Sequence, residues 1–140
     1  MPHHLLADHL VALGFKAASG FRYKRIVIIS PDHFRQTDKP FATTRLGFET
    51  PLGTARTDTQ AVEKLLGAGD WIEDSCLFAT EHGVQAMLPF VKHYFPDAQI
   101  VPIAMSIRAA RADWDRMADT LAPLLGADTL LVESTDFSHY

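Results

Sequence analysis

Histidine and aspartate residues gather at three points where this sequence predicts loops that follow strands. The three points are Pro2-His3-His4, the pair Asp32-His33, and Asp136 with His139. Neutral imidazole is the commonest metal ligand in proteins and also a general base near neutral pH. Two histidines and one further ligand on one face, with open positions, is the arrangement of non-haem Fe(II) oxygenases. A nearby carboxylate could orient a ligating imidazole by accepting its second N–H. These residue types therefore predict a metal or proton-transfer site where the loops meet.

The same residues also have ordinary structural interpretations. Asp32 could be a turn residue that bonds its own backbone. Glu81 and His82 could simply begin a helix, where the helix dipole favours the carboxylate. Ser138 beside His139 suggests a serine hydrolase, but the G-x-S-x-G nucleophile elbow is absent from the sequence. Both interpretations of Asp32 and of Glu81 stay open at this point.

Hydrophobic periodicity predicts strands that alternate with helices. The predicted strands cover residues 25–30, 99–105 and 129–134, and the predicted helices cover 5–15, 57–66, 81–95 and 114–125. Pro89 should kink the third of these helices, and Pro102 suggests that its strand lies at a sheet edge or bulge. Residues 35–56 read as a long loop or a small hairpin. The alternation predicts an α/β fold with a parallel or mixed sheet and helices on both faces. In such sheets, ligands bind at the carboxyl ends of the strands.

Composition excludes several classes of protein. The 140 residues suit one domain, and a net charge of −4 without long runs of like charge argues against nucleic-acid binding. The single cysteine, Cys76, excludes an internal disulfide and a thiolate zinc site. No apolar run approaches the roughly 20 residues of a membrane span, and no secretory signal is visible. We therefore expect a cytoplasmic protein without a membrane anchor.

Five motifs, in their order and spacing, resemble the Memo family, which is also called AmmeMemoRadiSam system protein B. They are Pro2-His3, Ile29-Ser30-Pro31-Asp32-His33, Thr50-Pro51-Leu52-Gly53, Glu81-His82-Gly83-Val84-Gln85 with Leu88-Pro89-Phe90, and Ser134-Thr135-Asp136-Phe137-Ser138-His139-Tyr140. The resemblance covers essentially the whole chain. It implies a fold similar to that of the class III extradiol dioxygenases, which cleave catechol rings with Fe(II).

The resemblance also assigns roles to residues. His3 and His33 match the two metal-ligand histidines, and His139 matches the acid–base histidine, with Asp136 beside it. The surrounding pocket would include Asp32, Glu81, His82 and Ser138. The third ligand, a cysteine in Memo proteins and a glutamate in the dioxygenases, comes from a later segment. The resemblance therefore implies that the third ligand is absent from this chain.

Three functions follow as hypotheses, and whether the chain is an enzyme stays open. The first is a redox protein with an iron or copper site. The second is a non-catalytic module that retains the dioxygenase-like pocket and binds a protein or a small ligand. The third is a metal-assisted hydrolase, in which a bound metal activates water. The resemblance implies protein partners, among them radical-SAM proteins.

Both ends of the chain read as cuts through a larger domain. Pro2-His3-His4 resembles a loop that follows a strand, and the last predicted strand leads straight into site residues. We therefore expect one Memo-like domain over residues 1–140 that is truncated at both ends. An incomplete sheet leaves unpaired edges, so we also expect a homo-oligomer or dependence on a missing segment.

Overall fold

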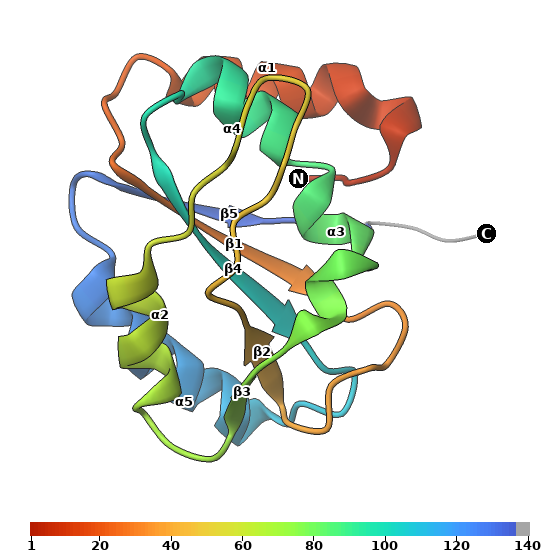
Figure 1. Ribbon diagram of the computed structural model, residues 1–140, viewed down its shortest axis with the longest axis vertical. Helices are drawn as coiled ribbons and strands as arrows, with labels where there is room; N and C mark the ends of the chain where they lie inside the picture. The colour runs from red at the N-terminus through yellow and green to blue at the C-terminus, as the bar shows by residue number, and fades with distance from the viewer. Residues whose placement is uncertain (137–140) are drawn as a thin grey trace.

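The computed structural model describes residues 1–136, in which one mixed β-sheet lies between two layers of helices (Figure 1). The strands are β1 (Arg25–Pro31), β2 (Phe41–Thr43), β3 (Ile72–Asp74), β4 (Gln99–Met105) and β5 (Thr129–Glu133). Their order across the sheet is β3-β2-β4-β1-β5. Strand β1 runs parallel to both of its neighbours, whereas β2 is antiparallel to β4 and parallel to β3. The predicted α/β fold is therefore confirmed, and the sheet is mixed. Ser138 and His139 lie outside the described residues.

Helices cover the sheet on both faces (Figure 1). They are α1 (Asp8–Ala18), α2 (Thr59–Leu66), α3 (His82–Gln85), α4 (Leu88–Tyr94) and α5 (Arg111–Leu121), with 3₁₀ turns η1 (Leu5–Ala7), η2 (Cys76–Ala79) and η3 (Ala122–Leu124). Helices α1 and α4 pack on one face, and α2 and α5 on the other. None of the helices among residues 1–136 has the length and apolar character needed to cross a membrane.

The central strand β1 shows why its sequence is almost continuously apolar. Ile26 and Ile28 belong to the core beneath α1 and α4, whereas Val27 belongs to the core beneath α2 and α5. Successive side chains of a strand point to opposite faces of the sheet. A strand covered on both faces must therefore be apolar at every position.

The structure departs from the predictions made for Pro89 and Pro102. Pro89 does not kink one long helix, because the segment forms two helices and Pro89 lies in the first turn of α4, where a missing N–H costs little. The prediction that Pro102 marks a sheet edge is wrong, since β4 lies between β2 and β1. The missing N–H of Pro102 is tolerated because it faces a break in the pairing along the side of β4 that points away from β1. On this side, Ile100 pairs with residue 57, and the pairing with β2 begins only at Ile103.

Helix α1 packs on the sheet through a face other than the one that carries its leucines. Its buried residues are Val11 and Phe15, whereas Leu6, Leu10 and Leu13 are 85%, 51% and 59% exposed. The helix thus carries two apolar stripes, and periodicity alone does not decide which of them faces the core.

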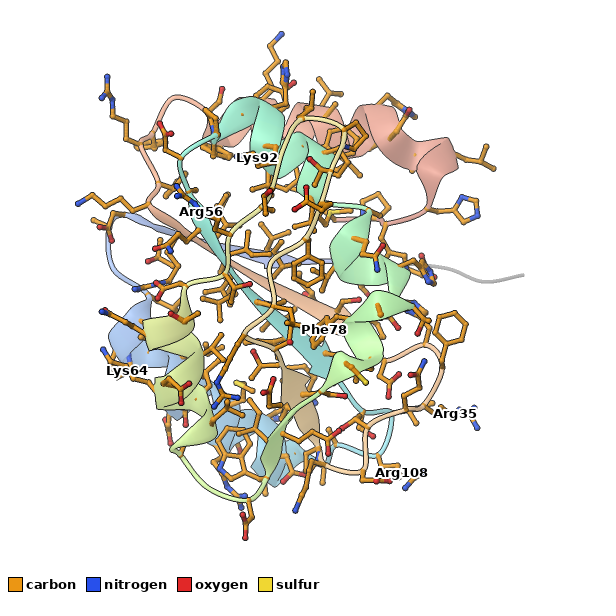
Figure 2. The ribbon with its side chains drawn as sticks, viewed as in Figure 1. Arg35, Arg56, Lys64, Phe78, Lys92 and Arg108 are labelled. Carbon is orange, nitrogen blue, oxygen red and sulfur yellow. The ribbon has the colours of Figure 1, made fainter. Side chains whose placement is uncertain are left out.

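The segment between β1 and α2 supplies β2, which pairs with β4 and β3, and then forms a small hairpin around residues 48–55. Strand β2 has only three residues, and a single antiparallel bridge joins Phe48 to Ala55. Phe78 of η2 is buried and lies edge-to-face with Phe48, whereas the labelled Arg35, Lys64 and Arg108 extend outward (Figure 2). The hairpin is therefore anchored to the body of the molecule by apolar packing.

Candidate metal centre

Three imidazoles converge at the carboxyl ends of β1 and β5. His3, His33 and His82 each offer one ligand atom, and these atoms all lie within 4.8 Å of one another. The ring centroids are 4.7 Å apart for His3 and His33, 5.3 Å for His3 and His82, and 4.3 Å for His33 and His82. His3 is buried, His33 is half-buried and His82 is exposed, so the cluster spans the distance from the core to the surface.

Separate elements bring each ring to this point. His33 follows β1 directly, and His82 is the first residue of α3. His3 is held because the preceding Met1 lies against β5, where its carbonyl accepts a hydrogen bond from the Thr135 N–H at 2.9 Å. The cluster is therefore built from the first residues of the chain, the central strand, and a helix that crosses the end of the sheet.

The buried carboxylate of Glu81 fixes the orientation of His33. Glu81 Oε1 lies 2.7 Å from His33 Nδ1 and accepts the Gly83 N–H at 2.8 Å, and Oε2 accepts the His33 backbone N–H at 2.9 Å. Burial would raise the pKa of Glu81, but these hydrogen bonds outweigh it and hold the pKa below its usual range. Because a carboxylate only accepts, His33 Nδ1 carries its proton and Nε2 is left with a free lone pair.

The hydroxyl group of Ser134 fixes the orientation of His3. Ser134 Oγ donates its only proton to the Gly83 carbonyl at 2.6 Å and lies 3.2 Å from His3 Nδ1, so it accepts the proton of that nitrogen. Nε2 of His3 therefore carries the lone pair. This atom lies 3.2 Å from Asp136 Oδ1, within ion-pair distance, but without hydrogen-bond geometry. It is a buried nitrogen with no hydrogen-bond partner among residues 1–136.

His3 is held in its neutral form by its surroundings. Burial lowers the pKa of its imidazole, the Asp136 carboxylate opposes this, and the neighbouring His33 and His82 lower the pKa further. A neutral imidazole with a free Nε2 is the form that binds metals. The protonation state and the tautomer of His3 therefore both suit metal binding.

A close approach of α3 to β1 allows this arrangement. A Cβ atom at Gly83 would lie 1.8 Å from Ser30 Oγ, so any larger residue requires Ser30 to change its rotamer or α3 to shift away from the strand. Glycine at this position therefore brings Glu81 and His82 within reach of His33.

Of the two interpretations of Asp32, the structure shows the turn residue, because its side chain bonds the backbone of its own loop. Its Oδ2 accepts the Thr37 N–H at 2.8 Å, and its Oδ1 is buried without a hydrogen-bond partner among residues 1–136. Neither oxygen bonds an imidazole there. Asp32 thus shapes the loop that carries His33.

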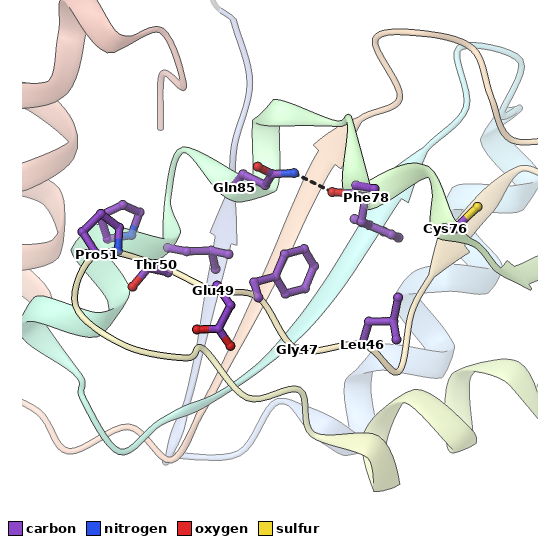
Figure 3. A pocket seen from close by; sticks show the side chains of 12 residues that line it. Leu46, Gly47, Glu49, Thr50, Pro51, Cys76, Phe78 and Gln85 are labelled. Carbon is purple, nitrogen blue, oxygen red and sulfur yellow. Dashed lines mark hydrogen bonds between the residues drawn. The ribbon is translucent and has the colours of Figure 1, made fainter.

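Two cavities share Gln85 and Pro89 in their walls. A cavity of about 670 Å³ reaches His3, His82 and Asp136 and has a mostly apolar wall that includes Phe90. A second, of about 440 Å³, lies between the hairpin and η2, where Gln85 Nε2 donates to the Phe78 carbonyl (Figure 3). Only the first one touches the imidazoles.

A third imidazole lies in the cluster, which the sequence did not predict. The resemblance placed the third ligand outside this chain and treated His82 as a pocket residue, but the structure places a ligand atom of His82 beside those of His3 and His33. One signal for this was present in the sequence, namely Glu81-His82 at a predicted helix start. That signal became informative only when the position of α3 over the sheet was known.

Comparison with known proteins agrees with the motif resemblance. The family model described as Memo-like protein matches residues 2–140. A MEMO1 family protein of Thermotoga neapolitana is 34% identical over 146 residues, which covers 99% of this chain and 52% of the relative. A MEMO1 family protein of Pyrobaculum arsenaticum is 29% identical over 147 residues, covering 100% of this chain and 52% of the relative. The chain thus spans about half the length of these curated relatives. These matches show that the chain belongs to the Memo-like family.

Proposed function

We propose that His3, His33 and His82 hold a redox-active metal ion, iron or copper, and that this centre is the functional site of the protein. The observation that carries the proposal is the convergence of three imidazoles, two of which have Nδ1 engaged by internal acceptors so that Nε2 is free. Imidazole ligands suit iron and copper. The buried Nε2 of His3 lacks a hydrogen-bond partner among residues 1–136, and its lone pair would bind the metal.

The geometry requires only a small adjustment. Metal–nitrogen bonds of roughly 2.0–2.1 Å place two ligand nitrogens about 3–3.5 Å apart, so nitrogens that lie within 4.8 Å of one another must draw together by up to about 1.5 Å. His82 is exposed and begins a short helix, so it has room to move. His33 is held by two hydrogen bonds to Glu81, whose carboxylate also accepts the Gly83 N–H, and it provides the fixed part of the site.

The charges near the cluster also fit a cation. Three neutral imidazoles bring no negative charge, but the carboxylates of Glu81 and Asp136 lie against His33 and His3. A bound iron or copper ion would supply one-electron chemistry at a position that the 670 Å³ cavity leaves open to small molecules. In this proposal, Asp136 balances charge beside His3, and His139 is the proton carrier, as the resemblance implies.

The test is metal content after anaerobic purification, measured by mass spectrometry on the wild type and on three single variants. We expect about one iron or copper per wild-type chain, loss of the metal in His33→Ala, and weaker retention in His82→Ala. His93→Ala is the matched control, since His93 is exposed on α4. If copper is bound, the nitrogen couplings in its electron paramagnetic resonance spectrum should lose one imidazole in His82→Ala. Equal metal content in all four proteins would contradict the proposal.

A second candidate function is binding without catalysis. The mostly apolar cavity beside His3 favours it, because such a surface suits a small apolar ligand whether or not a metal is present. Ligand binding that survives both chelation and His33→Ala would support this candidate. Radical-SAM proteins as partners, a homo-oligomer and a cytoplasmic location stay predictions.

A further inference from the structure

The cavity of about 670 Å³ beside the imidazole cluster runs from the core to the surface. Its lining includes His3, which is 3% exposed, and Asp8, whose side chain is 66% exposed. The start of α1 forms one side, and α3 with the first turn of α4 forms another (Figure 1). Binding sites for small molecules have volumes in this range. The cavity can therefore hold an organic ligand that reaches from solvent to the imidazoles.

One wall of the cavity is apolar. It consists of Ala86, Pro89 and Phe90, which are all half-buried. The Phe90 ring stacks parallel on the fully buried Phe15, with 6.2 Å between the ring centroids, so the core supports this wall from behind. Contact with the wall would remove the carbon surface of both partners from water. The body of a ligand that fits here is therefore apolar.

Every charged side chain that lines the cavity within residues 1–136 is acidic. Asp8 and Asp136 are the two carboxylates, and neither lysine nor arginine is part of the described wall. Asp136 is the more enclosed of the two, since its side chain is 19% exposed and lies 3.2 Å from His3 Nε2. The wall thus brings two negative charges to a ligand and no permanent positive charge. Such a wall attracts a cation and repels an anion.

Two features would favour an anion, and both are outweighed. Helix α1 begins at the cavity, and a helix N-terminus carries roughly half an elementary positive charge. Asp8 is the first residue of α1 and places a full negative charge at the same point. A divalent ion held by the imidazoles would add two positive charges at the inner end, which the carboxylates of Glu81 and Asp136 balance. Negative charge therefore remains at the outer end, beside Asp8.

We propose that this cavity binds a small organic cation, namely an amine whose protonated nitrogen lies near Asp8 and whose apolar body lies against Pro89 and Phe90. The inner end of the molecule would then face His3, whose buried Nε2 has no hydrogen-bond partner in the described part of the chain. The inference rests on the proposed function, because the imidazoles that would hold the metal form this inner end. The molecule that meets the metal would thus be an amine rather than a carboxylic acid.

The test compares three probes that share a phenyl ring and a four-carbon chain but differ in charge: 4-phenylbutylamine, 4-phenylbutanol and 4-phenylbutyrate. Each probe is titrated at pH 7 into the full chain after chelation of metals. Binding is followed by NMR at the amides of Ala86 and Phe90, which belong to the apolar wall. We expect the amine to bind about tenfold more tightly than the acid, with the alcohol between them, because each carboxylate attracts the amine and repels the acid.

Two variants locate the charge that selects the amine. Asp8→Asn should lower the affinity for the amine by about two- to fivefold and leave the affinity for the alcohol unchanged. Asp115→Asn is the matched control, because the Asp115 side chain is 62% exposed but lies on α5, on the opposite face of the sheet from α1. This control should alter neither affinity. Both positions are on the surface, where a substitution of this kind leaves the fold intact.

Three results would overturn the proposal. They are equal or tighter binding of the acid, an amine affinity that Asp8→Asn does not change, and the absence of binding by all three probes at millimolar concentration. Because the titration uses metal-free protein, its outcome is separate from that of the metal analysis. A chain that retains no metal but prefers the amine would contradict the proposed function alone. A chain that retains metal but shows no preference among the probes would contradict the amine site alone.

Discussion

Replacing Glu81 by glutamine tests the buried carboxylate that joins His33 to α3. The substitution keeps the volume of the side chain but changes one acceptor oxygen into an amide donor. Three donors now point at the two carboxylate oxygens: His33 Nδ1–H, the His33 backbone N–H and the Gly83 N–H. A glutamine carbonyl can serve only the oxygen position it occupies, so its NH₂ group must face at least one of these donors. A hydrogen bond to a charged group contributes roughly 1.5–3 kcal/mol, and a buried unsatisfied donor costs a further 1–3 kcal/mol. We therefore expect Glu81→Gln to lower the free energy of unfolding by about 2.5–6 kcal/mol.

The same variant should weaken metal binding. Groups that hold a ligating histidine typically account for about 10- to 100-fold in metal affinity, so Glu81→Gln should lose affinity in that range even though no ligand is removed. The assays are urea unfolding of the metal-free protein and a metal titration at fixed pH. Glu63→Gln is the matched control, because Glu63 is exposed and pairs with Arg45 on the surface, where ion pairs contribute little. If Glu81→Gln were no more destabilising than Glu63→Gln and bound metal equally well, the assigned role of Glu81 would be refuted.

Two other predictions concern packing. Gly83→Ala should destabilise the protein by roughly 1–3 kcal/mol, because the new Cβ overlaps Ser30 Oγ. Thermal unfolding measures this change, and the double variant with Ser30→Gly should recover part of the lost stability. If Gly83→Ala left the stability unchanged, α3 would not lie this close to β1. Phe15→Ala should cost about 3–5 kcal/mol, since Phe15 is fully buried, whereas Leu10→Gln on the exposed stripe of α1 should change stability by less than about 0.5 kcal/mol. The reverse order in urea unfolding would show that α1 packs through its leucines.

Local sequence predicted the central strands and the edge of the sheet that carries the site. Strands β1, β4 and β5 are apolar runs in a sheet covered on both faces, and such runs are readable without knowledge of the fold. The loops after β1 and β5 were correctly placed at one edge, because parallel strands share a direction. His3 and His33 were predicted to come together, and they do.

The missed features depend on contacts between distant segments. Strand β3 has only three residues, too few for a pattern to show. Pro102 was misplaced because its effect depends on which neighbour its missing N–H faces. His82 joined the cluster only because α3 approaches β1 at Gly83, and that distance is a tertiary property.

The hydrogen-bonded contact between His3 and Ser134 joins residues 131 positions apart in the chain. Closing so long a loop costs conformational entropy that only later contacts can offset, and folding slows as such non-local contacts increase. The three-imidazole cluster should therefore form late in folding, when the first residues of the chain dock beside β5. The unfolded chain has no preassembled site, so a ligand of the cluster would bind the native state alone and stabilise it in proportion to its concentration. Metal loading would then report whether the two ends of the chain have met, and loss of the first few residues would abolish loading while leaving β1 and β4 paired.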